Sequence, residues 1–286
     1  MNKPEMRLHC LSSSVQFVLE QCNVFIDEAE ITTSPLSFRM RKEDEVDTMM
    51  NEAIWDWMDQ NTEYIKYKNE LIKFERNMIL LLPIRHLSYA KVYKNEFIGD
   101  KTHFVVIIEK NKDKLKIYDP FIPTLPISEK IAEISIEELP KKKVMGIKIL
   151  KYNFDLSKKN GLFLSQQIKY ESNIWNVLIS KLKSLTLNNS LELIGEMGDS
   201  SVEASRKLII GFYERNQSVK TGGAQNILFF KWQKLWFSVR INIYKYFLTQ
   251  RDSYLRDAII DVIKLKKIDN KVFSLIRNED FKNDRN

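Results

Sequence analysis

The stretch of sequence that decides the fold is THFVVIIEKNKDKLKIYDP, residues 102–120. It holds two apolar runs joined by a polar connection from Lys110 to Lys114, a length typical of a β-hairpin. In such a hairpin the start of the first strand lies beside the end of the second, so we expect His103 and Asp119 to approach across the two strands. They share a face of the sheet if the connection holds an odd number of residues, because side chains alternate along a strand.

A cysteine stands at the predicted start of a helix near the beginning of the sequence. Cys10 precedes the run from Leu11 to Gln21, where apolar residues recur at helical spacing. Free N–H groups and the dipole at a helix N-terminus stabilise an anion, and the thiolate is the reactive form of cysteine. The alternative is a small buried thiol. Cys22, on the apolar face at the far end of this helix, is predicted to be part of the core.

Cys10, His103 and Asp119 follow one another in the order of nucleophile, base and orienting carboxylate. Catalysis by a thiol requires this set, because the imidazole takes the proton and the carboxylate holds the imidazole in one tautomer. Without Cys10, the other two residues would be interpreted as an edge histidine and a turn aspartate before Pro120. With Cys10 in the matching chain order, the three residues favour catalysis.

Five short segments occur in a fixed order along the first half of the chain. They are HCLSSSVQFVL at 9–19, DEAE at 27–30, ILLLP at 79–83, THFVVII at 102–108 and IYDP at 117–120. In this order they resemble the N-terminal domain of the butirosin biosynthesis protein H family. The resemblance covers roughly residues 5–150, and a weaker likeness continues around Gly222-Gly223 and the aromatic segment after them.

This resemblance implies an α+β fold: a papain-like cysteine-peptidase-type domain with an antiparallel sheet, similar to the leader peptidases of bacteriocin exporters, followed by a mostly helical domain. It implies an acyltransferase of antibiotic and other secondary metabolism. Cys10 would accept an acyl, aminoacyl or peptidyl group from an acyl or peptidyl carrier protein and pass it to the amine or hydroxyl of a small-molecule acceptor. No metal or dissociable cofactor is expected, because the phosphopantetheine arm belongs to the carrier.

One departure from the papain-like pattern lies just before the cysteine. Papain-like peptidases carry a glutamine there that supplies an oxyanion-hole donor, whereas this chain has Pro4, Glu5, Met6 and Arg7. Loss of one such donor costs about 3 kcal/mol of transition-state stabilisation. Acyl transfer from a thioester is less demanding than amide cleavage, so the departure favours the transferase. A donor could instead come from the Cys10 N–H and a side chain such as His9.

Composition narrows the class of protein. The chain has 286 residues, 44% hydrophobic and 29% charged, which is typical of a globular protein with an ample core. We expect no membrane span, no signal peptide and a cytoplasmic location that keeps its two cysteines reduced. The net charge of +7 reflects scattered lysines and suits an acidic carrier partner, but the fold signals do not support nucleic-acid binding.

Strand and helix signals divide the chain into a catalytic domain at 1–154 and a helical domain at 155–286. The helical domain is expected to pack on the catalytic domain and to wall the cleft leading to Cys10. Helical patterns are predicted at 44–77, 161–187, 200–217, 225–248 and 253–267, strands at 78–82 and 144–152, and a short helix or acidic turn at 131–139.

Two other interpretations remain open from the sequence. One is a cysteine peptidase or hydrolase that uses the same three residues with water as the acceptor. The other is a binding module that keeps the fold without the chemistry, for which the missing glutamine is the best argument. The sequence also leaves open whether His9 or His86 joins the site, and it does not identify the acyl group or the acceptor.

Overall fold

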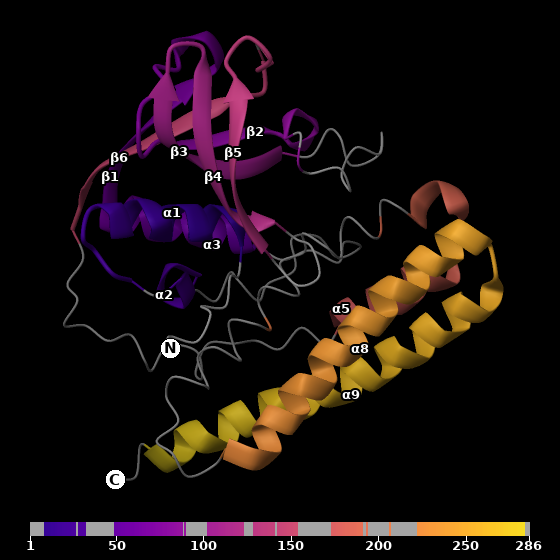
Figure 1. Ribbon diagram of the computed structural model, residues 1–286. Coiled ribbons are helices and arrows are strands. Elements are labelled where there is room, and N and C mark those ends of the chain that lie inside the picture. Colours follow the sequence, from indigo (N-terminus) through magenta and orange to yellow (C-terminus); the bar gives the residue numbers. More distant parts are fainter. Residues whose placement is uncertain are drawn as a thin grey trace. The chain divides into compact units, whose positions relative to one another are not determined.

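The computed structural model describes residues 9–26, 28–32, 49–87, 89, 102–122, 128–140, 142–153, 173–190, 193, 206 and 222–283 (Figure 1). The chain divides into two compact units, Met1–Thr32 with Asn51–Lys159 and Thr33–Met50 with Asn160–Asn286. The boundary predicted at 154/155 lies outside the described residues. The packing of a helical domain on a catalytic domain stays a prediction of the sequence.

The first unit is built on a six-stranded sheet in which every neighbouring pair of strands is antiparallel. This confirms the α+β class with an antiparallel sheet. The strand order is β1-β6-β2-β3-β4-β5. The strands are β1 (Thr62–Lys68), β2 (Ile79–Pro83), β3 (Thr102–Asn111), β4 (Lys114–Ile122), β5 (Ser128–Ser135) and β6 (Met145–Tyr152).

Three α-helices accompany this sheet: α1 (Cys10–Gln21), α2 (Glu28–Thr32) and α3 (Met50–Asn61). Short 3₁₀ turns follow β1 at Asn69–Leu71 and β2 at Ile84–His86. Helix α1 packs against β3 and β4, where the Phe17 and Tyr118 ring centroids are 4.3 Å apart. Its residues Leu11, Val15 and Leu19 are completely buried, so the apolar stripe of the sequence does anchor the helix that begins at Cys10.

A β-bulge in the β3–β4 hairpin decides which side chains share a face. The turn holds two residues, Lys112 and Asp113, and an even connection would place Asp119 opposite Val106. The register shifts between Ile107 and Glu109, so the pairs beyond that point are Ile107–Ile117 and Val106–Tyr118. One further step sets Asp119 beside Val105, on the same face as His103. The two-residue turn alone would place His103 and Asp119 on opposite faces, and the one extra residue of the bulge brings them to the same face.

Two predictions of local structure in this unit are wrong. Residues 62–68, part of the predicted helical stretch 44–77, form the edge strand β1, because Thr62, Tyr64 and Tyr67 pair with β6 across an antiparallel ladder. Residues 131–135, predicted as a short helix or acidic turn, belong to strand β5, which pairs with β4. Tertiary pairing overrides helical spacing in both segments.

The second unit is helical where the structure describes it. It contains α5 (Asn173–Lys183), α8 (Gly222–Thr249) and α9 (Asp252–Asn283), and α8 packs along α9 (Figure 1). The helices predicted at 225–248 and 253–267 correspond to α8 and α9. The predicted segments 161–172 and, except Arg206, 200–217 lie outside the described residues.

Three tryptophans form the centre of this helical core. The Trp232 and Trp236 rings stack with centroids 5.5 Å apart, and Trp175 meets Trp236 edge to face. The Trp175 Nε1–H donates to Asp269 Oδ2 over 2.8 Å, and the buried Arg206 guanidinium pairs with the same carboxylate. No helix within the part of the chain that the structure describes has the length and apolar character of a membrane span.

Gly146 of β6 provides a test of the sheet packing. A Cβ at this position would lie 2.7 Å from Met78 Sδ and 3.2 Å from Ile72 Cγ2. We expect Gly146→Ala to lower the free energy of unfolding by about 1–3 kcal/mol, measured by urea denaturation, because the core is already filled. Met78→Val removes the sulfur that the new Cβ would meet. The double variant Gly146→Ala/Met78→Val should therefore lose less free energy of unfolding than the sum of the losses in the two single variants, and strict additivity would contradict this account.

Candidate active site

The first turn of α1 presents Cys10 on a capped helix end. His9 is the N-cap residue, with extended backbone angles (φ −156°, ψ 145°), and its Nδ1 accepts a hydrogen bond from the Leu11 N–H over 3.2 Å. An accepting Nδ1 leaves Nε2 as the ring nitrogen that carries the proton in neutral His9. The structure therefore gives His9 a capping role beside the cysteine.

Glu28 of α2 is the hydrogen-bond acceptor for groups around the first turn of α1. Its Oε1 accepts hydrogen bonds from the His9 N–H over 2.9 Å, from the Ser13 hydroxyl over 2.8 Å and from the Ser12 hydroxyl. Glu28 is only 3% exposed, and both serines are completely buried. A carboxylate that receives several hydrogen bonds at a helix N-terminus is stabilised by the N–H groups and the dipole. The contacts fix residues on both sides of Cys10.

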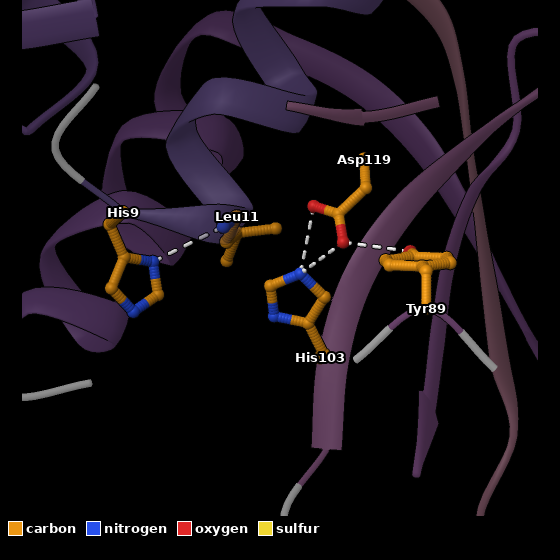
Figure 2. A network of polar contacts seen from close by, with 5 residues as sticks. All are labelled: His9, Leu11, Tyr89, His103 and Asp119. Atoms are coloured by element: carbon orange, nitrogen blue, oxygen red, sulfur yellow. Dashed lines mark hydrogen bonds and ion pairs between the residues drawn. The ribbon is translucent and has the colours of Figure 1, made fainter. Parts of the chain in front are cut away.

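His103 and Asp119 come together as the hairpin predicts. His103 Nε2 lies 2.9 Å from Asp119 Oδ1 and 3.0 Å from Oδ2, so one N–H is shared between both carboxylate oxygens (Figure 2). The two residues are 7% and 1% exposed. Because Nε2 is engaged by Asp119, Nδ1 is the ring nitrogen left to exchange a proton with another group.

Cys10 acts on the same imidazole. Burial lowers the pKa of His103, but the Asp119 carboxylate, Cys10 and the hydrogen bonds between the ring and both groups outweigh burial and raise that pKa well above its usual value. The raised pKa favours the charged imidazolium form of the ring, with the Asp119 carboxylate on Nε2 and Cys10 from the start of α1 as its partners. Cys10 itself is partly exposed. The structure thus brings all three predicted residues together.

Asp119 has a further hydrogen-bond donor that the sequence analysis did not identify. The Tyr89 hydroxyl donates to Asp119 Oδ2 over 2.8 Å (Figure 2). Tyr89 follows the 3₁₀ turn after β2, and no motif marks it. Glu28 was likewise missed as a site residue, although it lies in the DEAE segment at 27–30 and the two serines in the first turn of α1 need a buried acceptor.

Two other predicted positions lie apart from this chemistry. His86, in the 3₁₀ turn Ile84–His86, has a pKa lowered first by burial and then by Arg85, partly offset by Glu138. Cys22 is exposed, so its assignment to the core is wrong. It is the C-cap of α1, and the left-handed Asn23 (φ 61°) turns the chain there, away from the apolar stripe.

The start of α1 also offers a donor for a developing oxyanion. Among the residues that the structure describes, none accepts a hydrogen bond from the Cys10 N–H, whereas the Leu11 and Ser13 N–H groups are bound by His9. A free N–H at a helix N-terminus beside a nucleophile is suited to an oxyanion. The stretch Pro4–Arg7, where papain-like peptidases carry their glutamine, lies outside the described residues.

Comparison with known proteins identifies no family for this chain. No protein-family model matches the chain, and no curated protein is significantly similar to it. Within the described ranges, no group of three or more His, Cys, Asp or Glu residues is placed to hold a metal ion. The chemistry is therefore argued from Cys10, His103, Asp119 and their immediate partners.

The Glu28 contacts predict a loss of stability on substitution. Glu28→Ala removes the acceptor of the His9 N–H and the Ser13 hydroxyl, whereas the Ser12 hydroxyl can still donate to the His9 carbonyl. Each buried donor left unsatisfied costs about 1–3 kcal/mol, so we expect a loss of at least about 2 kcal/mol in the free energy of unfolding, measured by urea denaturation. The matched control is Glu30→Ala. Glu30 lies two residues after Glu28 in the same helix and is exposed, so its replacement should change stability by less than about 0.5 kcal/mol. Equal losses in the two variants would contradict the structural role of Glu28.

The raised pKa of His103 predicts a response to removal of the carboxylate charge. In Asp119→Asn the burial that lowers the pKa remains while the strongest raising influence is lost, so the pKa of His103 should fall by about one unit or more. NMR titration of the three histidine rings measures this directly. The titration of His86 is the internal control, and Asp113→Asn in the exposed turn of the same hairpin is the matched variant. An unchanged His103 pKa in Asp119→Asn would contradict the pairing.

The same pairing gives a pH dependence of stability. Folding raises the pKa of His103 above the value of about 6.5 of an unfolded histidine. Its stabilising effect is therefore fully present below about pH 6.5 and is lost as the pH rises through the folded-state pKa. The stability difference between the wild type and Asp119→Asn should be larger at pH 6 than above that folded-state pKa, and a difference that grows with pH would contradict it.

Proposed function

We propose that this chain is a cysteine-dependent acyltransferase with a papain-like catalytic domain, working in the cytoplasm on a thioester carried by an acyl or peptidyl carrier protein. The observation that supports it best is the buried His103–Asp119 pair, whose imidazolium meets a partly exposed cysteine at a helix N-terminus. Each component has a defined part in thiol catalysis. The acyl donor and the biosynthetic context come from the resemblance to the butirosin biosynthesis protein H family.

The first half of the reaction forms an acyl-enzyme. The Cys10 thiolate attacks the carbonyl carbon of the thioester, a new C–S bond forms and the negative charge moves to the carbonyl oxygen. The Cys10 N–H at the start of α1 donates to that oxygen. The intermediate collapses with breakage of the original C–S bond. The pantetheine sulfur departs with the bonding electron pair and takes the proton from His103 Nδ1, so that it leaves as a thiol.

The second half returns the enzyme to its starting state. Neutral His103 takes a proton from the amine or hydroxyl of the acceptor as that group attacks the acyl-enzyme carbonyl. The bond to Cys10 breaks, and the cysteine leaves as a thiolate beside the renewed imidazolium. Asp119 stays a carboxylate throughout and holds the imidazole through Nε2.

Thioester chemistry suits this site better than amide cleavage. A thiol leaving group departs readily, so one well-placed backbone donor meets a smaller demand than a peptidase would face. The net charge of +7 favours the approach of an acidic carrier, and this attraction weakens as salt rises. A peptidase or hydrolase would use the same residues with water as the acceptor, so the partition between transfer and hydrolysis separates the two activities.

The nucleophile assignment is tested by intact-mass spectrometry after incubation with acyl-pantetheine thioesters. The wild type and Cys22→Ala should gain one acyl group, whereas Cys10→Ala should gain none, because no neighbour replaces a nucleophile. Cys22 is the matched control since it ends the same helix and is exposed. Asp119→Asn should still acylate, slower by roughly 10²–10⁴-fold, because an orienting group affects the tautomer without forming bonds.

The outcome with added acceptor decides the class of reaction. Loss of the acyl group to an added amine in preference to water supports the transferase, and loss to water at the same rate with and without amine supports a hydrolase. Acylation of Cys10→Ala at the wild-type rate would overturn the proposed mechanism. Failure of every thioester to react with the wild type would favour a binding module.

A further inference from the structure

The Tyr89 hydroxyl shares the carboxylate that orients His103. It donates to Asp119 Oδ2 over 2.8 Å, and His103 Nε2 lies 3.0 Å from that oxygen and 2.9 Å from Oδ1 (Figure 2). Oδ2 therefore receives two donors, one from the catalytic base and one from a residue with no assigned part in the reaction. A carboxylate oxygen has room for both, but each donor reduces the charge available to the other.

Tyr89 remains a hydrogen-bond donor under all conditions in which the enzyme would work. Burial, and then the charge of Asp119 and the hydrogen bond to it, raise the pKa of Tyr89 above its usual value, so the phenol does not ionise near neutral pH. It is therefore not suited to carrying a proton in the reaction. Its effect on the site has to act through the position and charge of Asp119.

The ring of Tyr89 is held in place by its surroundings. It packs against the buried cluster of the sheet that includes Leu82, Val105 and Ile117. The Lys130 ammonium lies 5.5 Å from the ring centroid, and Lys130 is the register partner of Asp119 on the edge strand β5. Asp119 is only 1% exposed although this neighbouring position on β5 is exposed. A ring packed in this way can hold its hydroxyl at one point on the carboxylate.

We propose that Tyr89 is a positioning residue of the thiol site: its hydroxyl fixes the Asp119 carboxylate with both oxygens toward His103 and takes part of the negative charge that would otherwise act on the imidazolium alone. Its consequence for turnover rests on the acyl transfer proposed above. In that reaction His103 must give its proton to the departing sulfur. If the whole charge of the Asp119 carboxylate acted on the imidazolium, His103 would be a weaker acid and would release this proton less readily. Tyr89 thus sets how readily the base gives up and regains its proton.

The charged and titratable groups around His103 allow a direction to be predicted. Cys10 at the start of α1 and Asp119 on β4 both raise the pKa of His103. The Tyr89 hydroxyl donates to Asp119, and the Lys130 ammonium of β5 lies over the Tyr89 ring. Removing the Tyr89 hydroxyl leaves Cys10 and Lys130 unchanged and returns the carboxylate charge to the imidazolium. The pKa of His103 should then rise above its wild-type value.

The experiment is an NMR titration of His103 in Tyr89→Phe, which keeps the ring and removes the hydroxyl. We expect an upward shift of roughly 0.5 to 1 unit relative to the wild type. The matched control is Tyr67→Phe, since Tyr67 packs against the same cluster and has no contact with Asp119 among the described residues. Tyr67→Phe should leave the titration of His103 unchanged.

A second background separates positioning from a general structural effect. In Asp119→Asn the carboxylate charge is absent, so adding Tyr89→Phe should move the pKa of His103 by less than about 0.2 unit. An unchanged or lowered pKa in Tyr89→Phe alone would overturn the proposal, and so would an equal shift in both backgrounds. Loss of the folded His103 signal in Tyr89→Phe would assign the hydroxyl to the fold and would overturn it as well.

This titration does not depend on turnover. If the predicted shift appears while no thioester acylates Cys10, the positioning role stands and the acyltransferase proposal fails. If acylation proceeds and the shift is absent, the acyltransferase proposal stands and the role of Tyr89 fails. When both hold, acyl transfer by Tyr89→Phe should be slower than that by Tyr67→Phe, because protonation of the leaving thiol becomes more difficult.

Discussion

A buried imidazolium has to be paired, and the shared hydrogen bond between His103 Nε2 and the two oxygens of Asp119 meets this requirement. Burial alone lowers the pKa of His103, so the pKa is raised because the Asp119 carboxylate and Cys10 lie beside the ring. The chain meets the geometric demand with the bulge between Ile107 and Glu109, which turns His103 and Asp119 to one face. The rest of the site is arranged around this pair.

A second buried carboxylate performs a different task at the other end of the site. Glu28 accepts hydrogen bonds from the first turn of α1 and ties α2 to the residues around Cys10. It holds backbone and hydroxyl groups, whereas Asp119 holds a charged ring. The groups that hold the residues around Cys10 are therefore distinct from the group that holds His103.

The proposed chemistry needs only a few groups, and the site contains each of them. In the proposed mechanism the Cys10 thiolate is the attacking species and His103 carries the proton, which are the roles that thiol catalysis requires. The Cys10 N–H offers one oxyanion donor at the start of α1, which suits a thioester with its good leaving group better than a peptide bond. In this view Tyr89 moderates the hold of Asp119 on the base, because a base that never releases its proton cannot protonate a leaving group.

The sequence by itself determined the elements on which the site depends: an apolar stripe that makes Cys10 the start of a helix, and two apolar runs whose short connection makes a hairpin with His103 and Asp119 near its open end. These signals are local, with a period of 3.6 or 2 residues, and therefore can be read from neighbouring positions. Tertiary structure alone decided that residues 62–68 form a strand, that a bulge sets the facing of the pair, and that Glu28 and Tyr89 complete it. The strand at 62–68 and the contacts of Glu28 and Tyr89 depend on partners that are distant in the chain, which local periodicity does not identify. The bulge lies within the hairpin, but it is an irregularity that the alternation of side chains does not reveal.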